Sequence, residues 1–289
     1  MKTRGTVWLL GASSGLGLAT AHAFAEAGWL VVAGARSFAA PSGAEETGKM
    51  AKQGTEKQNI HQLPLDVTDE ACCEAFARQA LAISDRVDVL CYAAGLLVLG
   101  SCEETDAGEY ERVMQTNFIG MTRMVAKVLP VMRAQKSGKL LLFSSLNGVM
   151  GIPFQSAYTA SKHAIEGYAE CLALEVKPFH ISVCVVEPGD HQGGSQAYRL
   201  HAGMAKGSSA YAQEYASACT TIHRDESAGL PAERLGRKVA QLADAKKMRF
   251  RLRVASIDQR AACLLHAMLP QRLFSSLMRS YYVKKGSET

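Results

Sequence analysis

A tyrosine and a lysine four residues apart have the types and the spacing needed to move a proton. Tyr158 and Lys162 lie in a segment whose apolar pattern predicts a helix over residues 156–176. Residues at positions i and i+4 share one face of a helix. A lysine ammonium beside a phenol favours the phenolate and lowers its pKa from about 10, so the tyrosine can act as a general acid or base. This spacing is common by chance, and its meaning depends on the residues around it.

Two further polar residues stand where such a site would need them. Ser145 lies just after an apolar run that predicts a buried strand over residues 139–143. Open α/β sheets bind their ligands at the carboxyl ends of the strands. Asn117 stands at the start of another predicted helix, where an asparagine is otherwise only a cap. These positions make Asn117 and Ser145 candidates for the same site as Tyr158 and Lys162.

A glycine-rich turn follows the first predicted strand, Thr6–Leu10, and opens a helix predicted over residues 15–27. Its spacing is G-x-x-x-G-x-G. Glycines let the backbone approach a pyrophosphate, and the N-terminus of the helix offers it unpaired N–H groups. The turn therefore predicts a dinucleotide site with these residues: Gly11, Ser13, Ser14, Gly15, Leu16 and Gly17.

The end of the second predicted strand, residues 29–33, indicates which dinucleotide binds. NAD-binding proteins usually carry an acid there, whereas an arginine accommodates the 2′-phosphate of NADP. Here no acid is present and Arg36 follows the strand. A guanidinium offers phosphate a bidentate fork, and Ser13 can add a hydroxyl. The sequence favours NADP(H) over the alternative that Arg36 is an ordinary surface arginine.

Alternating apolar and amphipathic segments must position these residues. Further strands are predicted over residues 60–65, 87–93, 139–143, 181–187 and 248–254, with helices over 68–83, 106–115 and 117–135. Such alternation implies parallel strands joined by right-handed crossovers. We expect an α/β fold: a single doubly wound Rossmann-type domain spanning residues 1–289, with a mostly parallel seven-stranded sheet and helices on both faces.

Composition excludes several other classes of protein. The net charge of +5 is too mild, without clustered groove-reading or stacking residues, to indicate nucleic acid. Eight cysteines with no C-x-x-C pair favour reduced thiols over a disulfide framework, and hence a cytoplasmic protein. No apolar run approaches the roughly 20 residues of a membrane span. No histidine or cysteine spacing suggests a metal site.

Taken in order, these motifs resemble those of the short-chain dehydrogenase/reductase family over roughly residues 6–189, and the chain looks most similar to its steroid and retinol dehydrogenase branch. The resemblance implies that Tyr158 exchanges a proton with the substrate oxygen and that Lys162 bonds the nicotinamide ribose. It further implies that Ser145 holds the substrate oxygen, with Ser144 as its rival, and that Asn117 supports a water relay. It adds these cofactor contacts: Asp66, Val67, Ala94, Gly95, Pro188 and Gly189.

Two departures from the family pattern affect the site. Tyr92 and Ala93 stand where the family has two asparagines, so the hydrogen bonds of those side chains must come from elsewhere. Gly193 stands where the family has a threonine that anchors the carboxamide, for which Ser195 is a possible substitute.

The chain beyond Gly189 decides the substrate. Residues 189–227 are rich in glycine, serine and alanine without a sustained period, so we expect a substrate lid, with Asp190 and His191 as a polar pair within it. Residues 257–285 form a cationic amphipathic tail. With the basic run from Lys246 to Arg253, this tail predicts either weak contact with an anionic membrane or, as the favoured interpretation, a solvated strand edge and a helix docked on the core.

Two hypotheses of function follow. The first is an NADP(H)-dependent oxidoreductase that interconverts a carbonyl and a primary or secondary alcohol on a hydrophobic, hydroxysteroid- or retinol-like substrate. The alternative is a non-catalytic NADP(H)-binding regulatory protein on the same fold. The intact set of Asn117, Ser145, Tyr158 and Lys162 favours the enzyme. The resemblance also implies a homodimer or homotetramer.

Overall fold

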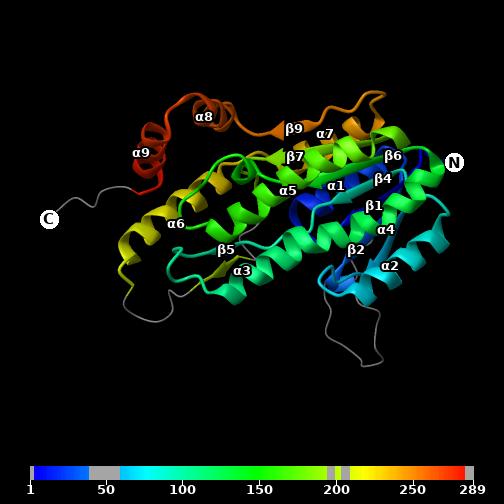
Figure 1. The fold of residues 1–289 in the computed structure, drawn as a ribbon, viewed down its shortest axis with the longest axis horizontal. Helices are drawn as coiled ribbons and strands as arrows, with labels where there is room; N and C mark the ends of the chain where they lie inside the picture. The colour runs from blue at the N-terminus through cyan, green and yellow to red at the C-terminus, as the bar shows by residue number, and fades with distance from the viewer. Residues whose placement is uncertain (1–2, 39–58, 194–198, 203–208, 284–289) are drawn as a thin grey trace.

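Seven parallel strands form the centre of the structure, a computed structural model that describes residues 3–38, 59–193, 199–202 and 209–283 (Figure 1). Their order across the sheet is β3-β2-β1-β4-β6-β7-β9, and each neighbouring pair is parallel. The strands are β1 (Thr6–Leu10), β2 (Leu30–Ala35), β3 (Ile60–Pro64), β4 (Val89–Tyr92), β6 (Gly138–Phe143), β7 (Ile181–Pro188) and β9 (Arg251–Val254). The predicted doubly wound α/β fold is confirmed, with a fully parallel sheet among these strands. The single domain over residues 1–289 stays a prediction.

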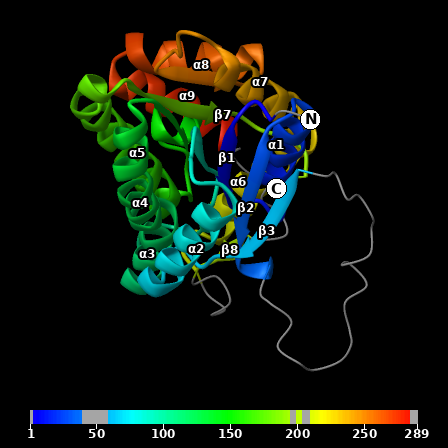
Figure 2. The ribbon, with the colours of Figure 1, turned by 90° about the vertical axis from the view of Figure 1, so that its right-hand side faces the viewer.

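Helices cover both faces of the sheet, as Figure 2 shows with α4 and α5 on one side and α1 on the other. One face carries α1 (Gly15–Glu26) and α7 (Ala232–Asp244); the other carries α2 (Glu70–Ile83), α4 (Gly120–Gln135) and α5 (Ser156–Glu175). Alternate residues of β1 belong to the two cores: Trp8 lies in the core under α2, α4 and α5, where its ring contacts Phe76, and Leu9 lies in the core under α1 and α7. A strand buried on both faces must be apolar throughout, which explains its continuous run.

Short elements complete the framework around the carboxyl edge of the sheet. They are α3 (Ala107–Met114), the π-helical turn η2 (Gln115–Ile119), the 3₁₀ turns η1 (Arg36–Phe38), η3 (Leu146–Gly148) and η4 (Lys177–Phe179), and a small parallel pair formed by β5 (Val98–Leu99) and β8 (Leu200–His201). A capping box begins α3: Asp106 accepts from the backbone of Glu109, whose side chain accepts in return. The helix η2 links α3 to α4 without a break.

The expected lid, residues 189–227, contains more regular structure than its sequence predicted. α6 (Ala212–Ser227) is a helix of 16 residues. Its buried positions include Tyr215, Ala218 and Ile222, at helical spacing. The expectation of no sustained period was wrong there, because small and half-polar residues hold the inner face and blur the apolar signal. Ser195, the suggested carboxamide anchor, lies outside the described residues.

The C-terminal part forms two helices, α8 (Ile257–Met268) and α9 (Gln271–Tyr282), beside α6 at the end of the molecule away from the N-terminus (Figure 1). Two arginines of the basic run from Lys246 to Arg253, which precedes these helices, form ion pairs within the protein. Arg251 pairs with Glu166 and Glu170, and Arg253 pairs with the fully buried Glu187. These two arginines therefore hold β9 to the fold. Within the described residues, no helix combines the length and the apolar character that crossing a bilayer requires.

Candidate active site

Tyr158 and Lys162 lie on the face of α5 that packs toward the carboxyl edge of the sheet. Lys162 is buried, and its Nζ donates to the carbonyl oxygen of Phe143, the last residue of β6, at 2.7 Å. The same Nζ lies 5.3 Å from the centroid of the Tyr158 ring. The predicted shared face is therefore confirmed by contact.

Of the two serines after β6, the geometry places Ser145 beside Tyr158. Ser145 has its side chain hydrogen-bonded to that of Tyr158, and its Oγ accepts from the backbone N–H of Asn147 at 3.2 Å, which begins η3. Ser144 is buried on the opposite side, where its Oγ donates to the carbonyl oxygen of Lys162 at 3.4 Å. The spacing argument for Ser145 agrees with this arrangement.

Asn117 is fully buried in the π-helical turn η2, which widens the helix at this point. Its Oδ1 accepts from the N–H of Leu96 at 2.7 Å, and its Nδ2 donates to the Leu96 carbonyl and to Ser161 Oγ. Single π-turns inside helices are frequent at functional sites. A Cβ on Gly95 would lie 3.8 Å from Asn117 Oδ1 and 3.9 Å from Lys162 Nζ. Gly95 thus brings the end of β4 next to both predicted catalytic residues.

The glycine turn forms a cradle that fits a pyrophosphate. Gly11 has a φ of +85°, and a Cβ there would lie 2.5 Å from the backbone nitrogen of Ala94. A Cβ on Gly17 would lie 2.0 Å from the carbonyl oxygen of Gly11. Ser14 caps α1 with no side-chain hydrogen bond, and the first turn of α1 holds no acid. The first N–H groups of this helix therefore remain available to an anion.

Arg36 stands exposed in η1, directly after β2. Asp66 follows the neighbouring β3. Partial burial tends to raise the pKa of Asp66, but hydrogen bonds from Thr68 and the charge of Arg36 outweigh it and lower this pKa. The two residues thus lie close enough to interact where the adenosine end of a dinucleotide is expected. Val67 is different: its side chain is buried in the core, and its carbonyl accepts from Arg123.

Pro188 and Gly189 end β7 beside the tail helices. The N–H of Gly189 donates to the carbonyl of Val254 at 2.9 Å, and a Cβ there would lie 2.1 Å from Gln259 Oε1. Gln259 also donates to the Asp190 carboxylate. His191 bonds instead to the Gly189 carbonyl through Nδ1. Asp190 and His191 thus face different partners, and this geometry fits the polar lid pair of our interpretation.

A family model described as short chain dehydrogenase matches residues 5–199. The chain belongs to this family. It is 34% identical to the 3-ketodihydrosphingosine reductase of Bacteroides thetaiotaomicron, over 96% of this chain and 97% of that protein. It is 35% identical to human retinol dehydrogenase 8, but over 64% of this chain and only 58% of that protein.

Solved structures agree with this family. A short-chain dehydrogenase from Streptomyces avermitilis has a TM-score of 0.78 and 28% identity, covering 97% of this chain and 99% of its own. An alcohol dehydrogenase from Thermococcus sibiricus, at 19% identity and a TM-score of 0.67, shares the fold over 88% of this chain and 97% of its own. The chain is therefore an oxidoreductase of the nicotinamide-binding kind. The roles of its individual residues stay predictions.

The electrostatics of this short-chain dehydrogenase differ from the expectation for Tyr158. Burial raises the pKa of Tyr158 to about 12, against the lowering effect of its hydrogen bond with Ser145. Burial also lowers the pKa of Lys162 to about 7, although the nearby Glu166 opposes this. The predicted lowering of the tyrosine pKa by its lysine is wrong for the protein alone, because the same low-dielectric surroundings disfavour both charged forms.

Tyr92 replaces a family asparagine, and the structure shows what it does instead. Its ring is buried among the apolar residues under α4, and its hydroxyl donates to the carbonyl of Thr116 at 2.5 Å. Thr116 directly precedes Asn117 in η2. A Cβ on Gly120 would lie 2.8 Å from this hydroxyl, so the glycine leaves room for it. Sequence reasoning missed this link because nothing in the motif indicates where the tyrosine hydroxyl points.

Apolar side chains of α6 and α9 border the predicted catalytic residues. Tyr158 packs against a cluster that includes Tyr215 of α6 and Tyr282 of α9. A second cluster joins Leu146, next to Ser145, with Phe274 of α9. Sequence reasoning did not find these wall residues individually. The spacing of Phe274, Met278 and Tyr282 is the signal that could have shown the inner face of α9.

Proposed function

We propose that this short-chain dehydrogenase uses NADP(H) to interconvert a ketone and a secondary alcohol on a long-chain lipid. The observation that carries the proposal is the position of Tyr158: its side chain is hydrogen-bonded to that of Ser145 and packs into an apolar cluster built by α6 and α9. A proton-exchanging group beside an apolar wall suits a hydrophobic carbonyl compound.

Each polar residue has a task in this proposal. The glycine turn and Arg36 would hold NADPH, which when bound would supply the hydride for reduction of the carbonyl. Ser145 donates a hydrogen bond to the carbonyl oxygen, and Tyr158 gives that oxygen the proton that completes the alcohol. Lys162 is proposed to bond the nicotinamide ribose. Asn117, next to Gly95 and Lys162, is proposed to support the water chain that returns a proton to Tyr158.

The preference for NADP(H) rests on Arg36. It is exposed at the carboxyl end of β2, and the segment from Leu30 to Arg36 contains no acid to bond a ribose 2′-hydroxyl. An arginine at this position accommodates a 2′-phosphate. Gly11, Gly15 and Gly17 are proposed to form the cradle for the pyrophosphate; the close packing at Gly11 and Gly17 and the positive φ of Gly11 and Gly15 support this.

The proposed substrate class rests on how much of the chain each relative matches. The bacterial relative named for 3-ketodihydrosphingosine matches 96% of this chain, which is more than the part that holds the sheet and the predicted catalytic residues. We therefore propose a keto group on a long aliphatic chain. A hydroxysteroid- or retinol-like substrate is the second candidate, favoured by human retinol dehydrogenase 8, whose match is limited to part of each chain.

A panel assay tests the proposal. NADPH oxidation is measured with a long-chain 3-keto amino alcohol, a steroid ketone and retinal, and is repeated with NADH. We expect the highest kcat/KM with the long-chain ketone and NADPH. A higher value with the steroid or retinal would move the assignment to the second candidate. Tight NADPH binding without turnover of any compound would support the non-catalytic regulator.

Assembly and location also enter as proposals. We propose a homodimer or homotetramer, which light scattering of the purified full chain tests directly. A cytoplasmic location is proposed from the reduced-thiol pattern, and fractionation of the native source tests it. A protein recovered only as a monomer, or only outside the cytoplasm, would contradict these two points.

A further inference from the structure

The two C-terminal helices carry an unusual amount of exposed apolar surface. Among the described residues, nine large apolar side chains are exposed, and seven of them lie on these helices. We call them the α8–α9 apolar face: Ile257, Leu264, Leu265, Met268, Leu273, Leu277 and Tyr281. Ile257 is 86% exposed and Met268 is 72% exposed. Large apolar side chains exposed in this number on two neighbouring helices are typical of an interaction site.

α9 is apolar on two sides, although a helix of a soluble protein needs only one. Phe274, Met278 and Tyr282 face the protein and pack in its core clusters. Leu273 and Leu277 form a second stripe, one position away, and are exposed. The inner stripe is sufficient to dock the helix. The outer stripe therefore has no role within the described fold.

The inner side of these helices covers the active site. Tyr282 belongs to the same cluster as Tyr158, and Phe274 packs with Leu146, the neighbour of Ser145. A hydrogen bond from Ser217 Oγ to the carbonyl of Tyr282, at 3.2 Å, fastens α9 to α6. The α8–α9 apolar face is thus the outer surface of the cover over the substrate side. Figure 1 shows both helices at one end of the molecule, beside α6.

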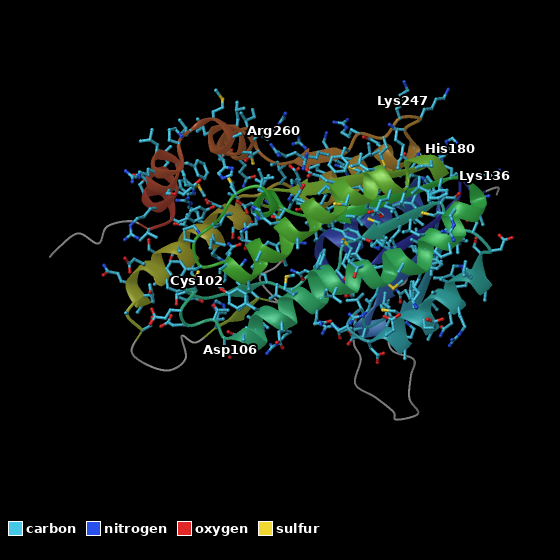
Figure 3. The ribbon with its side chains drawn as sticks, in the orientation of Figure 1. Cys102, Asp106, Lys136, His180, Lys247 and Arg260 are labelled. Atoms are coloured by element: carbon cyan, nitrogen blue, oxygen red, sulfur yellow. The ribbon has the colours of Figure 1, made fainter. Side chains whose placement is uncertain are left out.

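Positive charge accompanies the apolar face. Arg260, Arg272 and Arg279 are exposed on α8 and α9, which hold a single acid of their own, Asp258. Arg279 is paired with Glu214 of α6 at 3.0 Å, so Arg260 and Arg272 are the arginines that the proposal uses. Figure 3 shows Arg260 on α8 at the edge of the molecule. Arginines beside apolar side chains are typical of helices that lie in the headgroup region of an anionic bilayer. Tyr281 is held by α6 instead: its hydroxyl donates to Asp225 Oδ2 at 2.9 Å, and the Arg224 guanidinium lies over its ring.

We propose that the α8–α9 apolar face docks on the surface of a bilayer that contains anionic lipid. The substrate then reaches Tyr158 from the membrane. This route of substrate entry rests on the proposed function, because it needs a lipid substrate. A second copy of the chain is a less suitable partner: in a two-fold dimer the same face meets itself, which brings like-charged arginines together.

Sedimentation with vesicles tests the docking on the full chain. The vesicles contain phosphatidylcholine alone or with phosphatidylserine. The double variant Leu273→Ser/Leu277→Ser removes the outer stripe of α9. Leu174→Ser, at a residue 76% exposed on α5, is the matched control. We expect wild type and the control to bind the phosphatidylserine vesicles alike, and the double variant to bind at least about tenfold more weakly.

A charge variant tests whether the arginines beside the apolar face contribute to membrane binding. Arg260→Gln/Arg272→Gln is expected to weaken binding to phosphatidylserine vesicles by about fivefold per charge, with little effect on phosphatidylcholine alone. Equal vesicle binding by all variants, or none by wild type, would overturn the docking. A double leucine variant that changes the oligomeric state but not vesicle binding would assign the face to a second copy instead.

Turnover of a water-soluble ketone separates this proposal from the proposed function. Without vesicles, the double leucine variant and the double arginine variant are expected to turn over this ketone as fast as wild type. None of the changed residues contacts Tyr158 or Ser145. Full turnover with no vesicle binding would overturn the docking and leave the function standing. Vesicle binding with no turnover of any carbonyl would support the docking and overturn the function, and with it the route of entry.

Discussion

The hydroxyl of Tyr92 donates to the carbonyl oxygen of Thr116 at 2.5 Å. This bond joins the end of β4 to the π-helical turn that holds Asn117. Family members with an asparagine at position 92 must fix this region through another side chain. In this chain a buried aromatic ring therefore stands in place of a polar motif, and a single hydroxyl connects the end of β4 to the helical turn η2 of the candidate site.

Removing the Tyr92 hydroxyl should lower both the stability of the protein and its catalytic rate. We expect Tyr92→Phe to lower the free energy of unfolding by about 1–2 kcal/mol, because a buried carbonyl loses its partner. We also expect kcat to fall several-fold as Asn117 loses support. Denaturant unfolding and steady-state kinetics measure both effects. Tyr168→Phe, at a ring that packs against Phe118, is the matched control. Unchanged stability of the Tyr92 variant would show that the bond contributes nothing.

Arg36 should decide between the two nicotinamide dinucleotides. We expect Arg36→Ala to raise the KM for NADPH at least about tenfold, since hydrogen bonds to charged groups contribute roughly 1.5–3 kcal/mol. The KM for NADH should stay unchanged, because NADH lacks the 2′-phosphate. Arg78→Ala, at an exposed position on α2, controls for loss of a surface charge. An equal effect on both cofactors would remove Arg36 from phosphate recognition.

The third glycine of the turn should tolerate no side chain. A Cβ on Gly17 would lie 2.0 Å from the Gly11 carbonyl oxygen, so Gly17→Ala must push the turn away from α1. We expect NADPH binding to weaken at least about tenfold, as a strained cradle presents its N–H groups poorly. Titration calorimetry measures the affinity.

Gly167→Ala provides the contrast for this substitution. Gly167 lies in α5, where a Cβ would meet nothing within 4 Å. Alanine there should stabilise the protein by about 0.5–1 kcal/mol and leave NADPH affinity unchanged. Wild-type affinity in the Gly17 variant would mean that close packing of the turn is unnecessary for binding.

Asp190 should give the stability a distinctive pH dependence. Burial, with the charges of Glu226, Asp225 and Asp258, raises its pKa from 3.8 to about 7. Between these two values the folded protein keeps a proton that the unfolded chain releases. This carboxyl therefore costs stability as the pH rises from about 4 to about 7, and the cost is constant above that range.

Asp190→Asn should remove this cost while its amide oxygen still accepts from Gln259. We expect the variant to melt at least about 2 °C above wild type at pH 8, with the difference vanishing near pH 4. Melting curves at the two pH values measure it. Asp85→Asn, at an exposed carboxylate that is not among the groups acting on Asp190, is the control. A variant less stable than wild type at pH 8 would contradict the raised pKa.

The sequence predicted the sheet and the residues around it because local patterns encode them. Apolar runs such as that of β6 allow only a doubly buried strand, and the spacing of Tyr158 and Lys162 needs only the geometry of a helix. The glycine turn likewise follows from local backbone requirements. These features depend on neighbours in the chain.

Features that depend on distant neighbours were missed or wrong. The pKa of Tyr158 follows from burial by α6 and α9, which no spacing near residue 158 reveals. Arg251 and Arg253 looked like part of a solvated basic run, but their partners Glu166 and Glu187 come from other elements. The helical nature of α6 is hidden by its small residues. Tertiary packing decides all of these.

The most direct test of the account is the turnover of a long-chain ketone by Tyr158→Phe. NADPH oxidation and NADPH affinity are measured side by side for wild type and variant. We expect kcat to fall about 10²–10⁴-fold, as for loss of a general acid, with NADPH affinity unchanged. Equal turnover by the phenylalanine variant would contradict the assignment of Tyr158 as the proton donor.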